Sequence, residues 1–173
     1  MAFAIEAWRV RHGRAVAGWL TALAEIEALA SLATFAFDQP GTVFPDVLPD
    51  AEGPRFEADA LAHPLLAADV RVANDVRLGP ERQLLLVTGS NMAGKSTLLR
   101  TIGVNAVLAL AGAPVVARSL RLSRLSIGAT LRTTDSLQSG VSRFMAELNR
   151  LRAVLALTEG PAGVLFLFDE ILH

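Results

Sequence analysis

The sequence of 173 residues contains no cysteine and only one lysine, Lys95, against fifteen arginines. The absence of cysteine excludes disulfides and thiolate metal sites, and it is typical of proteins from a reducing compartment. The first residues lack the basic segment and apolar segment of a signal peptide, and no apolar run approaches the ~20 residues that span a bilayer. We therefore expect a soluble chain in the cytoplasm.

The single lysine is informative because the chain uses arginine wherever else it needs a cation. This choice indicates that position 95 requires a compact ammonium group, where a planar guanidinium would not fit. The formal net charge is only -1, but the chain after residue 82 carries a basic excess. That excess could serve a phosphate ligand, although ordinary solvated surfaces explain it equally well.

Residues 2–37 are rich in alanine, leucine, glutamate and arginine, and they have helical periodicity. We expect a break at Gly13, and we expect Trp8 and Trp19 to anchor a core. Residues 38–55 contain four of the eight prolines, which indicates a linker or an extended loop. We place the domain boundary there, between a helical segment (residues 1–50) and a second domain (residues 51–173).

The second domain alternates between strand and helix patterns. Helical patterns cover residues 97–112, with Gly112 as a C-cap, and residues 142–158. The predicted strands are residues 55–61, 72–78, 83–89, 113–117, 126–131 and 163–170. This alternation predicts an α/β fold with a largely parallel sheet.

Residues 89–96 read G-S-N-M-A-G-K-S, which matches the Walker A pattern of a P-loop. The two glycines permit backbone N–H groups to turn inward around a phosphate, and the following helix points its positive dipole end at the anion. In this arrangement Lys95 reaches the β- and γ-phosphates, and the Ser96 hydroxyl binds Mg²⁺. The predicted apolar strand before the loop and the helix after it provide the required context.

The apolar strand near the C-terminus ends in two carboxylates, Asp169 and Glu170. A P-loop needs an acidic residue at the end of a second strand, and Asp169 would hold Mg²⁺ next to Ser96. Glu170 would then orient or activate the attacking water. Taken alone, the two carboxylates would be better interpreted as a solvated strand end.

Several motifs in the same order resemble the ATPase domain of the MutS family. The loop T-G-S-N-M-A-G-K-S-T is similar to that family's T-G-P-N-M-A/G-G-K-S-T. The segments L-A-H-P-L-L, V-A-N-D-V, D-S-L-Q-S-G-V-S-R-F-M-A-E-L and F-D-E-I-L-H resemble other family motifs. The resemblance covers residues 55–173 and implies a P-loop NTPase domain of MutS/ABC type, preceded by the end of a helical core.

The resemblance also implies roles for individual residues. Arg71 and Val72 match the stretch that contacts adenine, and His63 is expected to be a structural hydrogen-bonding residue. Ser142 lies in a signature loop that reaches across a dimer interface to the partner's γ-phosphate. The residues that would line the phosphates are Gly89, Ser90, Asn91, Met92, Ala93, Gly94, Lys95, Ser96 and Thr97.

The chain departs from the family pattern at Arg143, where the signature has threonine. Arg143 could act as an arginine finger on a neighbouring nucleotide, or it could be a solvated arginine at a helix start. No counterpart of the family's mismatch-reading module is present. The family domain continues beyond the acidic strand, so we expect a fragment truncated after the Walker B strand, with weak or absent turnover.

The predicted function is therefore ATP binding and hydrolysis at a site shared by a homodimer, in a protein that contacts DNA through other regions. One alternative is a nucleotide-gated interaction module with little turnover. Another is an ATPase of the ABC or SMC type, although that class has L-S-G-G-Q where this chain has L-Q-S-G-V-S. A truncated chain that folds only partly is the third alternative.

Overall fold

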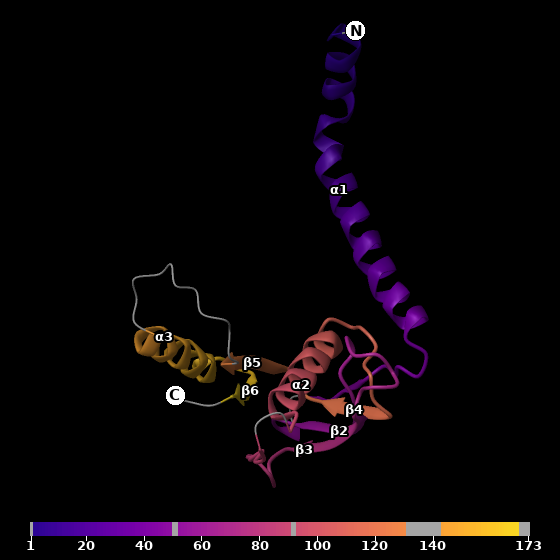
Figure 1. Ribbon diagram of the computed structural model, residues 1–173. Helices are drawn as coiled ribbons and strands as arrows, with labels where there is room; N and C mark the ends of the chain where they lie inside the picture. The colour runs from indigo at the N-terminus through magenta and orange to yellow at the C-terminus, as the bar shows by residue number, and fades with distance from the viewer. Residues whose placement is uncertain (1, 50–51, 91–92, 131–142, 170–173) are drawn as a thin grey trace. The chain divides into compact units, whose positions relative to one another are not determined.

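The computed structural model describes residues 2–49, 52–90, 93–130 and 143–169 of a mixed α/β chain (Figure 1). The chain divides into two compact units, residues 1–40 and 41–173, each of which is described by itself. The helices are α1 (Ala2–Asp38), α2 (Lys95–Leu110) and α3 (Arg143–Ala156), followed by a 3₁₀ turn at Leu157–Glu159. The strands are β1 (Asp46–Val47), β2 (Phe56–Leu61), β3 (Asn74–Leu78), β4 (Ser119–Leu122), β5 (Leu125–Thr130) and β6 (Gly163–Phe168).

The first unit is essentially the 37-residue helix α1. The helix runs through Gly13 without the predicted break, because one glycine costs only about 1 kcal/mol in a helix interior. The expectation that Trp8 and Trp19 anchor a core is also wrong, since they are 50% and 52% exposed. By length and composition alone, residues 3–38 could cross a membrane.

The second unit contains a four-stranded sheet with the order β1-β4-β2-β3. β2 and β3 were predicted, whereas the short strands β1 and β4 were not. β2 is antiparallel to both of its neighbours, with Phe56 opposite Leu78 on one side and Leu122 on the other. The expectation of a largely parallel sheet is therefore wrong here, because only the β1–β4 pair of this sheet is parallel.

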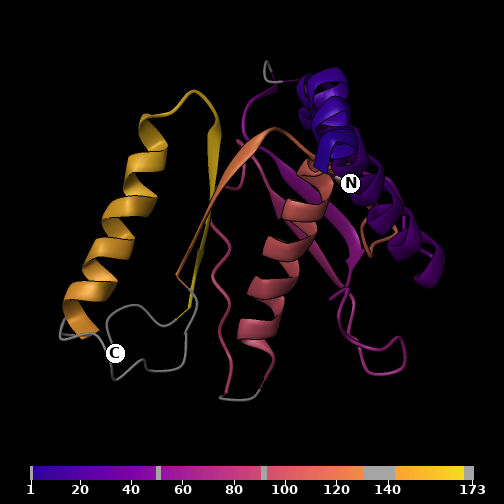
Figure 2. The same ribbon diagram turned by 90° about the horizontal axis from the view of Figure 1, so that it is seen from above.

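A second, two-stranded sheet pairs β5 and β6 in parallel, in register from Leu125–Gly163 to Thr130–Phe168. The predictions of β6 and of both helices α2 and α3 are confirmed. α2 packs against both strands of this sheet, and α3 packs against β5. Figure 2 shows α2 between the two sheets. The buried cluster that joins them comprises Phe56, Ala58, Leu61, Val76, Ile102, Ala106, Ala109, Val115, Ala117, Leu120, Leu122, Leu125, Leu165 and Leu167.

The prediction of a buried strand at residues 83–89 is wrong. This segment has no strand assignment, and Leu84 and Leu86 are each 78% exposed. A strand exists only when a neighbour accepts and donates its backbone hydrogen bonds. Within the part of the chain that the structure describes, residues 83–88 have no backbone partner. Residues 113–117 likewise form only an isolated bridge, from Val115 to Val43.

Candidate functional site

The amino end of α2 has the features of an anion-binding helix terminus. Gly94 is the N-cap residue, with φ 84° and ψ 13°, in the left-handed region that glycine adopts without steric cost. The cap makes no side-chain hydrogen bond, and the first turn carries no acidic residue. The first backbone N–H groups of α2 are therefore available to donate hydrogen bonds to another acceptor, and they lie at the positive end of the helix dipole.

Lys95 closes the loop that precedes α2. Its Nζ donates hydrogen bonds to the carbonyl oxygens of Gly89 at 2.7 Å and of Ser90 at 3.4 Å. The N–H of Ala93 donates to the Ser90 carbonyl at 3.2 Å, and a Cβ at position 89 would come within 3.3 Å of the Ala93 Cβ. The ammonium therefore lies against the carbonyl oxygens of Gly89 and Ser90, where phosphate oxygens could replace the two carbonyls as its acceptors.

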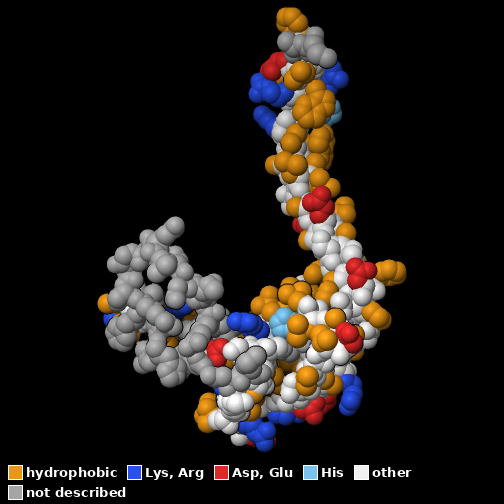
Figure 3. Space-filling view, in the orientation of Figure 1, with side chains coloured by type: hydrophobic (Ala, Val, Ile, Leu, Met, Phe, Trp, Pro, Cys, Tyr) orange, Lys and Arg blue, Asp and Glu red, His pale blue; other side chains and the backbone are white. Residues whose placement is uncertain are grey.

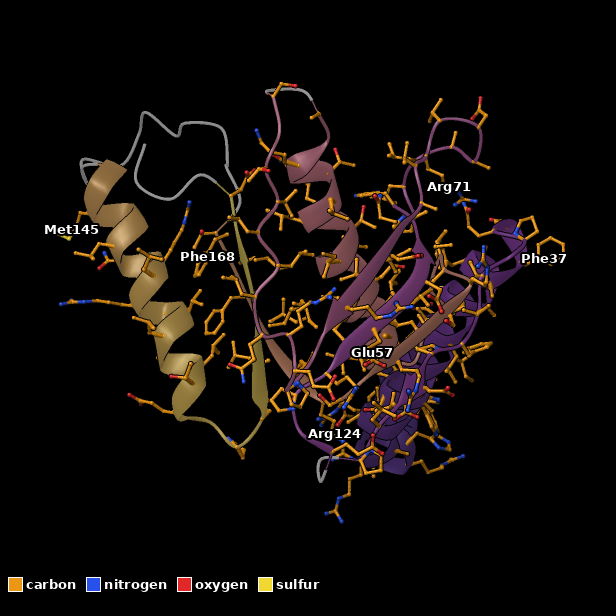
Figure 4. The ribbon with its side chains drawn as sticks, turned by 90° about the horizontal axis from the view of Figure 1, so that it is seen from below. Phe37, Glu57, Arg71, Arg124, Met145 and Phe168 are labelled. Carbon is orange, nitrogen blue, oxygen red and sulfur yellow. The ribbon has the colours of Figure 1, made fainter. Side chains whose placement is uncertain are left out.

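Asp169 directly follows β6, and its backbone N–H donates to the Thr130 carbonyl at 3.1 Å. Its partly buried side chain thus leaves the sheet where the parallel strands β5 and β6 end. Figures 2 and 4 show this end of β6 at the same edge of the unit as the amino end of α2.

The close packing of α2 on β6 allows the positions of Lys95 and Asp169 along these two elements to be compared. A Cβ at Gly103 would lie 2.8 Å from Cδ1 of Leu167, so the helix and strand touch closely at this point. Eight residues of helix place Lys95 about 12 Å beyond the contact, and two residues of strand place Asp169 about 7 Å beyond it. Lys95, Ser96 and Asp169 therefore lie at one end of the α2–β6 pair.

Magnesium is compatible with the side chains at this end. The Ser96 hydroxyl and the Asp169 carboxylate are hard oxygen donors, and Mg²⁺ needs few protein ligands because it retains several waters. Among the residues that the structure describes, no group of three or more His, Cys, Asp or Glu side chains could hold a metal by itself. A phosphate ligand would complete the coordination, as it does in P-loop sites of known function.

Arg71 and Val72 lie in the loop between β2 and β3, at the edge that also carries the amino end of α2 (Figures 2 and 4). Val72 is exposed, and Arg71 is partly buried. His63 accepts a 3.2 Å hydrogen bond at Nδ1 from the backbone N–H of Leu65, so it has the structural role expected for it.

One residue that the sequence analysis missed joins this loop to α2. Asn105 is completely buried, and its Nδ2 donates to the carbonyls of Ala62 at 3.0 Å and Thr101 at 2.9 Å. Its Oδ1 accepts from the N–H of Val116 at 3.0 Å. An asparagine within the apolar pattern of residues 97–112 is the signal that could have identified it, because a buried amide must be hydrogen-bonded.

Four predicted site residues, Asn91, Met92, Ser142 and Glu170, lie outside the described residues. Arg143 is the first residue of α3, but its side chain also lies outside them. Ser96 and Thr97 occupy the first turn of α2 directly after Lys95. The described residues of the loop before α2, α2 itself and the end of β6 therefore make up the described part of the candidate site.

Comparisons with known proteins identify the family of the chain. Residues 85–172 match the family described as MutS domain V. The chain is 38% identical over 156 residues to the DNA mismatch repair protein MutS of Chlorobaculum tepidum, covering 87% of the chain and 17% of that protein. It is 35% identical over 152 residues to a probable DNA mismatch repair protein Msh6 of Drosophila melanogaster, covering 86% of the chain and 13% of that protein. The chain belongs to the MutS family.

Proposed function

We propose that this chain is an ATP-binding and ATP-hydrolysing module of a MutS-like DNA repair protein, with a P-loop NTPase fold. The observation that carries the proposal is the position of Lys95. Its ammonium binds the carbonyls of Gly89 and Ser90 beside a helix terminus that has no side-chain cap. This combination of an ammonium group and open N–H donors suits a triphosphate.

The loop residues 89–97 would bind the phosphates through their backbone N–H groups. Lys95 would exchange its two carbonyl acceptors for β- and γ-phosphate oxygens, which are charged and therefore form stronger hydrogen bonds. The dipole of α2 would add to this attraction because it acts along the same direction. Arg71 and Val72 would contact the adenine ring from the loop after β2.

Hydrolysis would need a metal and an oriented water. Bound Mg²⁺ would neutralise the charge that develops on the phosphate oxygens. Ser96 and Asp169 would hold the ion, and Glu170 would orient the water for attack. Ser142 and Arg143 would act on the nucleotide of a second copy, which makes the complete site a property of a homodimer.

Titration calorimetry with Mg·ATP and Mg·ADP tests the proposal directly. We expect the wild-type chain to bind both nucleotides and Lys95→Ala to weaken ATP binding by about 10- to 100-fold, the loss expected for charge-assisted hydrogen bonds. Lys95→Arg should also bind weakly, since a planar fork cannot occupy the place of an ammonium. Arg100→Ala is the matched control, because it removes a cation from the exposed side of the same helix. A wild-type chain without nucleotide affinity would refute the proposal.

The chain spans 13% and 17% of the length of the two relatives. Mismatch repair by the whole protein, its contacts with DNA through other regions and its location in the cytoplasm are therefore part of the proposal. We expect this chain by itself to turn ATP over slowly or not at all, because groups outside it would complete the site.

A further inference from the structure

The buried side of α2 carries two polar residues, Thr101 and Asn105. Thr101 is 3% exposed and Asn105 is completely buried, and their buried neighbours on the helix are Ile102, Ala106 and Ala109. The visible face of the second unit mixes hydrophobic and charged side chains (Figure 3), whereas these two uncharged polar groups lie inside the unit. A polar group in an apolar core costs free energy unless it is hydrogen-bonded, so the partners of the two side chains show what each one does.

The two side chains differ in the groups that they bind. The Thr101 hydroxyl donates to the carbonyl of Thr97, 2.7 Å away and one turn earlier in the same helix. Asn105 also donates one bond within the helix, from Nδ2 to the Thr101 carbonyl at 2.9 Å. Its second donor and its acceptor bind backbone groups outside α2, the carbonyl of Ala62 and the N–H of Val116, each at 3.0 Å. Thr101 therefore serves the helix alone, whereas Asn105 joins the helix to two other segments.

These two segments also bind each other. The N–H of Ala62 donates to the carbonyl of Val116 at 2.8 Å, so Ala62, Val116 and Asn105 are joined pairwise by three hydrogen bonds. All three residues are buried and belong to the second unit, so the connection is internal to that unit. An apolar side chain of similar size at position 105 would fill the space but leave a buried carbonyl and a buried N–H unpaired. The amide therefore serves the connection rather than the packing.

Ala62 is the residue at which the chain leaves β2 for the loop of residues 62–73. Directly before it β2 contains a bulge, in which Ala60 has φ 50°, an uncommon value for a residue other than glycine. The Ala60 N–H donates to Oδ1 of Asp75 at 2.8 Å. Bulges redirect a strand and are frequent beside functional sites. The start of the loop is thus bent and held by two side chains, those of Asp75 and Asn105.

The loop beyond Ala62 has turns of its own. Two of them are closed by backbone hydrogen bonds to the carbonyls of His63 and Ala67, from residues three or four positions later. These bonds give the loop a local shape without connecting it to α2. The bond from Asn105 to Ala62, in contrast, joins the base of the loop to the helix.

We propose that Asn105 positions the adenine-contacting loop against α2 and thereby sets how much the base contributes to nucleotide binding. This role rests on the proposed function, in which the loop provides Arg71 and Val72 to the adenine and α2 provides the phosphate site. Asn105 lies ten residues after Lys95, about 15 Å along the helix, so it acts on the base and not on the phosphates. From there the loop returns toward the edge that carries the amino end of α2, where Figure 4 shows Arg71. Asn105 is therefore a positioning residue, not a catalytic one.

Titration calorimetry with Mg·ATP and with Mg·tripolyphosphate separates the base from the phosphates. The wild type should bind ATP about ten- to a hundredfold more tightly than tripolyphosphate, the contribution of one stacked base. Asn105→Ala should weaken ATP binding by about tenfold and leave tripolyphosphate binding within about twofold of the wild type. Thr101→Val is the matched control, because it removes a buried hydroxyl from the same side of α2 that serves the helix alone. The control should keep the wild-type ratio of the two affinities.

The ratio of affinities distinguishes positioning from a loss of stability. A variant that is partly unfolded loses both affinities by the same factor, so its ratio stays constant. An Asn105→Ala ratio equal to that of the wild type would overturn the proposal. Equal affinities of the wild type for ATP and tripolyphosphate would also overturn it, while leaving the phosphate site intact. A wild type that binds neither ligand would refute the proposed function itself.

Nuclear magnetic resonance of the wild-type chain gives a second test that needs no substitution at a buried position. ATP should shift the side-chain amide resonances of Asn105, and the backbone N–H resonance of Val116 that binds this side chain, more than tripolyphosphate does. The reason is that only ATP carries the base that engages the loop. Equal shifts with the two ligands would contradict the proposal even if Asn105→Ala failed to fold.

Discussion

The side-chain amide of Asn105 donates a hydrogen bond to the carbonyl of Ala62 across 3.0 Å, in a part of the core that water does not reach. The same side chain accepts a hydrogen bond from the N–H of Val116. One residue of α2 thus holds both the loop that follows β2 and the segment that precedes β4. The proposed phosphate site and the proposed adenine site share this connection.

Asn105→Leu should lower the free energy of unfolding by about 2–4 kcal/mol, because it leaves two buried backbone groups without partners. Thr101→Val is the control, since the Thr101 hydroxyl donates only within α2, to the carbonyl of Thr97. The free energy of unfolding of the control should fall by less than about 1 kcal/mol. Urea denaturation measures both variants, and equal losses would argue against a special role for Asn105.

Gly128→Ala should separate α3 from β5. A Cβ at position 128 would lie 2.5 Å from Cγ1 of Val154 and 3.3 Å from its Cβ, and a β-branched side chain cannot rotate away from both. We expect the free energy of unfolding to fall by about 1–3 kcal/mol, which is typical of overpacking. Adding Val154→Ala should recover part of this loss in a double-mutant cycle measured by urea denaturation. Strictly additive losses would show that the two residues do not meet.

Acid should weaken the contact between β2 and its neighbours through Asp59. The hydrogen bond from Arg77, and then that from Ser119, lower the pKa of this carboxyl. A lowered folded-state pKa contributes stability above the unfolded value of about 3.9, and this contribution is lost as the pH falls through the folded value. The urea concentration at the unfolding midpoint should therefore be higher for the wild type than for Asp59→Asn at pH 6. The difference between the two midpoints should shrink below pH 4. The effect should be small, because the Asp59 side chain is 38% exposed and solvent screens the interaction. A constant difference at both pH values would contradict this explanation.

The sequence predicted those elements whose patterns depend on local preferences. α2 follows from a helical pattern that precedes Gly112, and β6 follows from an apolar run in which Leu165 and Leu167 are buried. The errors concern the segments with which an element pairs or packs, which a single sequence does not specify. Residues 83–88 have a strand composition but no strand to pair with among the described residues, and Trp8 resembles a core residue although it is 50% exposed.

The candidate site could be predicted in part for the same reason. The proposed P-loop is contiguous in the sequence, so its glycines and Lys95 suggest it directly. Asn105 was missed because its partners are far along the chain, 43 residues before it at Ala62 and 11 residues after it at Val116. Only the fold brings those backbone groups to one side chain.

The central claim is that Ser96 and Asp169 face the same divalent cation in an ATP complex. A double-mutant cycle of Ser96→Ala and Asp169→Asn, measured as ATP affinity by calorimetry, tests it most directly. In the presence of Mg²⁺ the losses of ATP affinity should be strongly non-additive, because either variant alone removes the shared ion. In EDTA the losses of ATP affinity should be small and additive. Additive losses under both conditions, or ATP binding that is indifferent to Mg²⁺, would contradict the account.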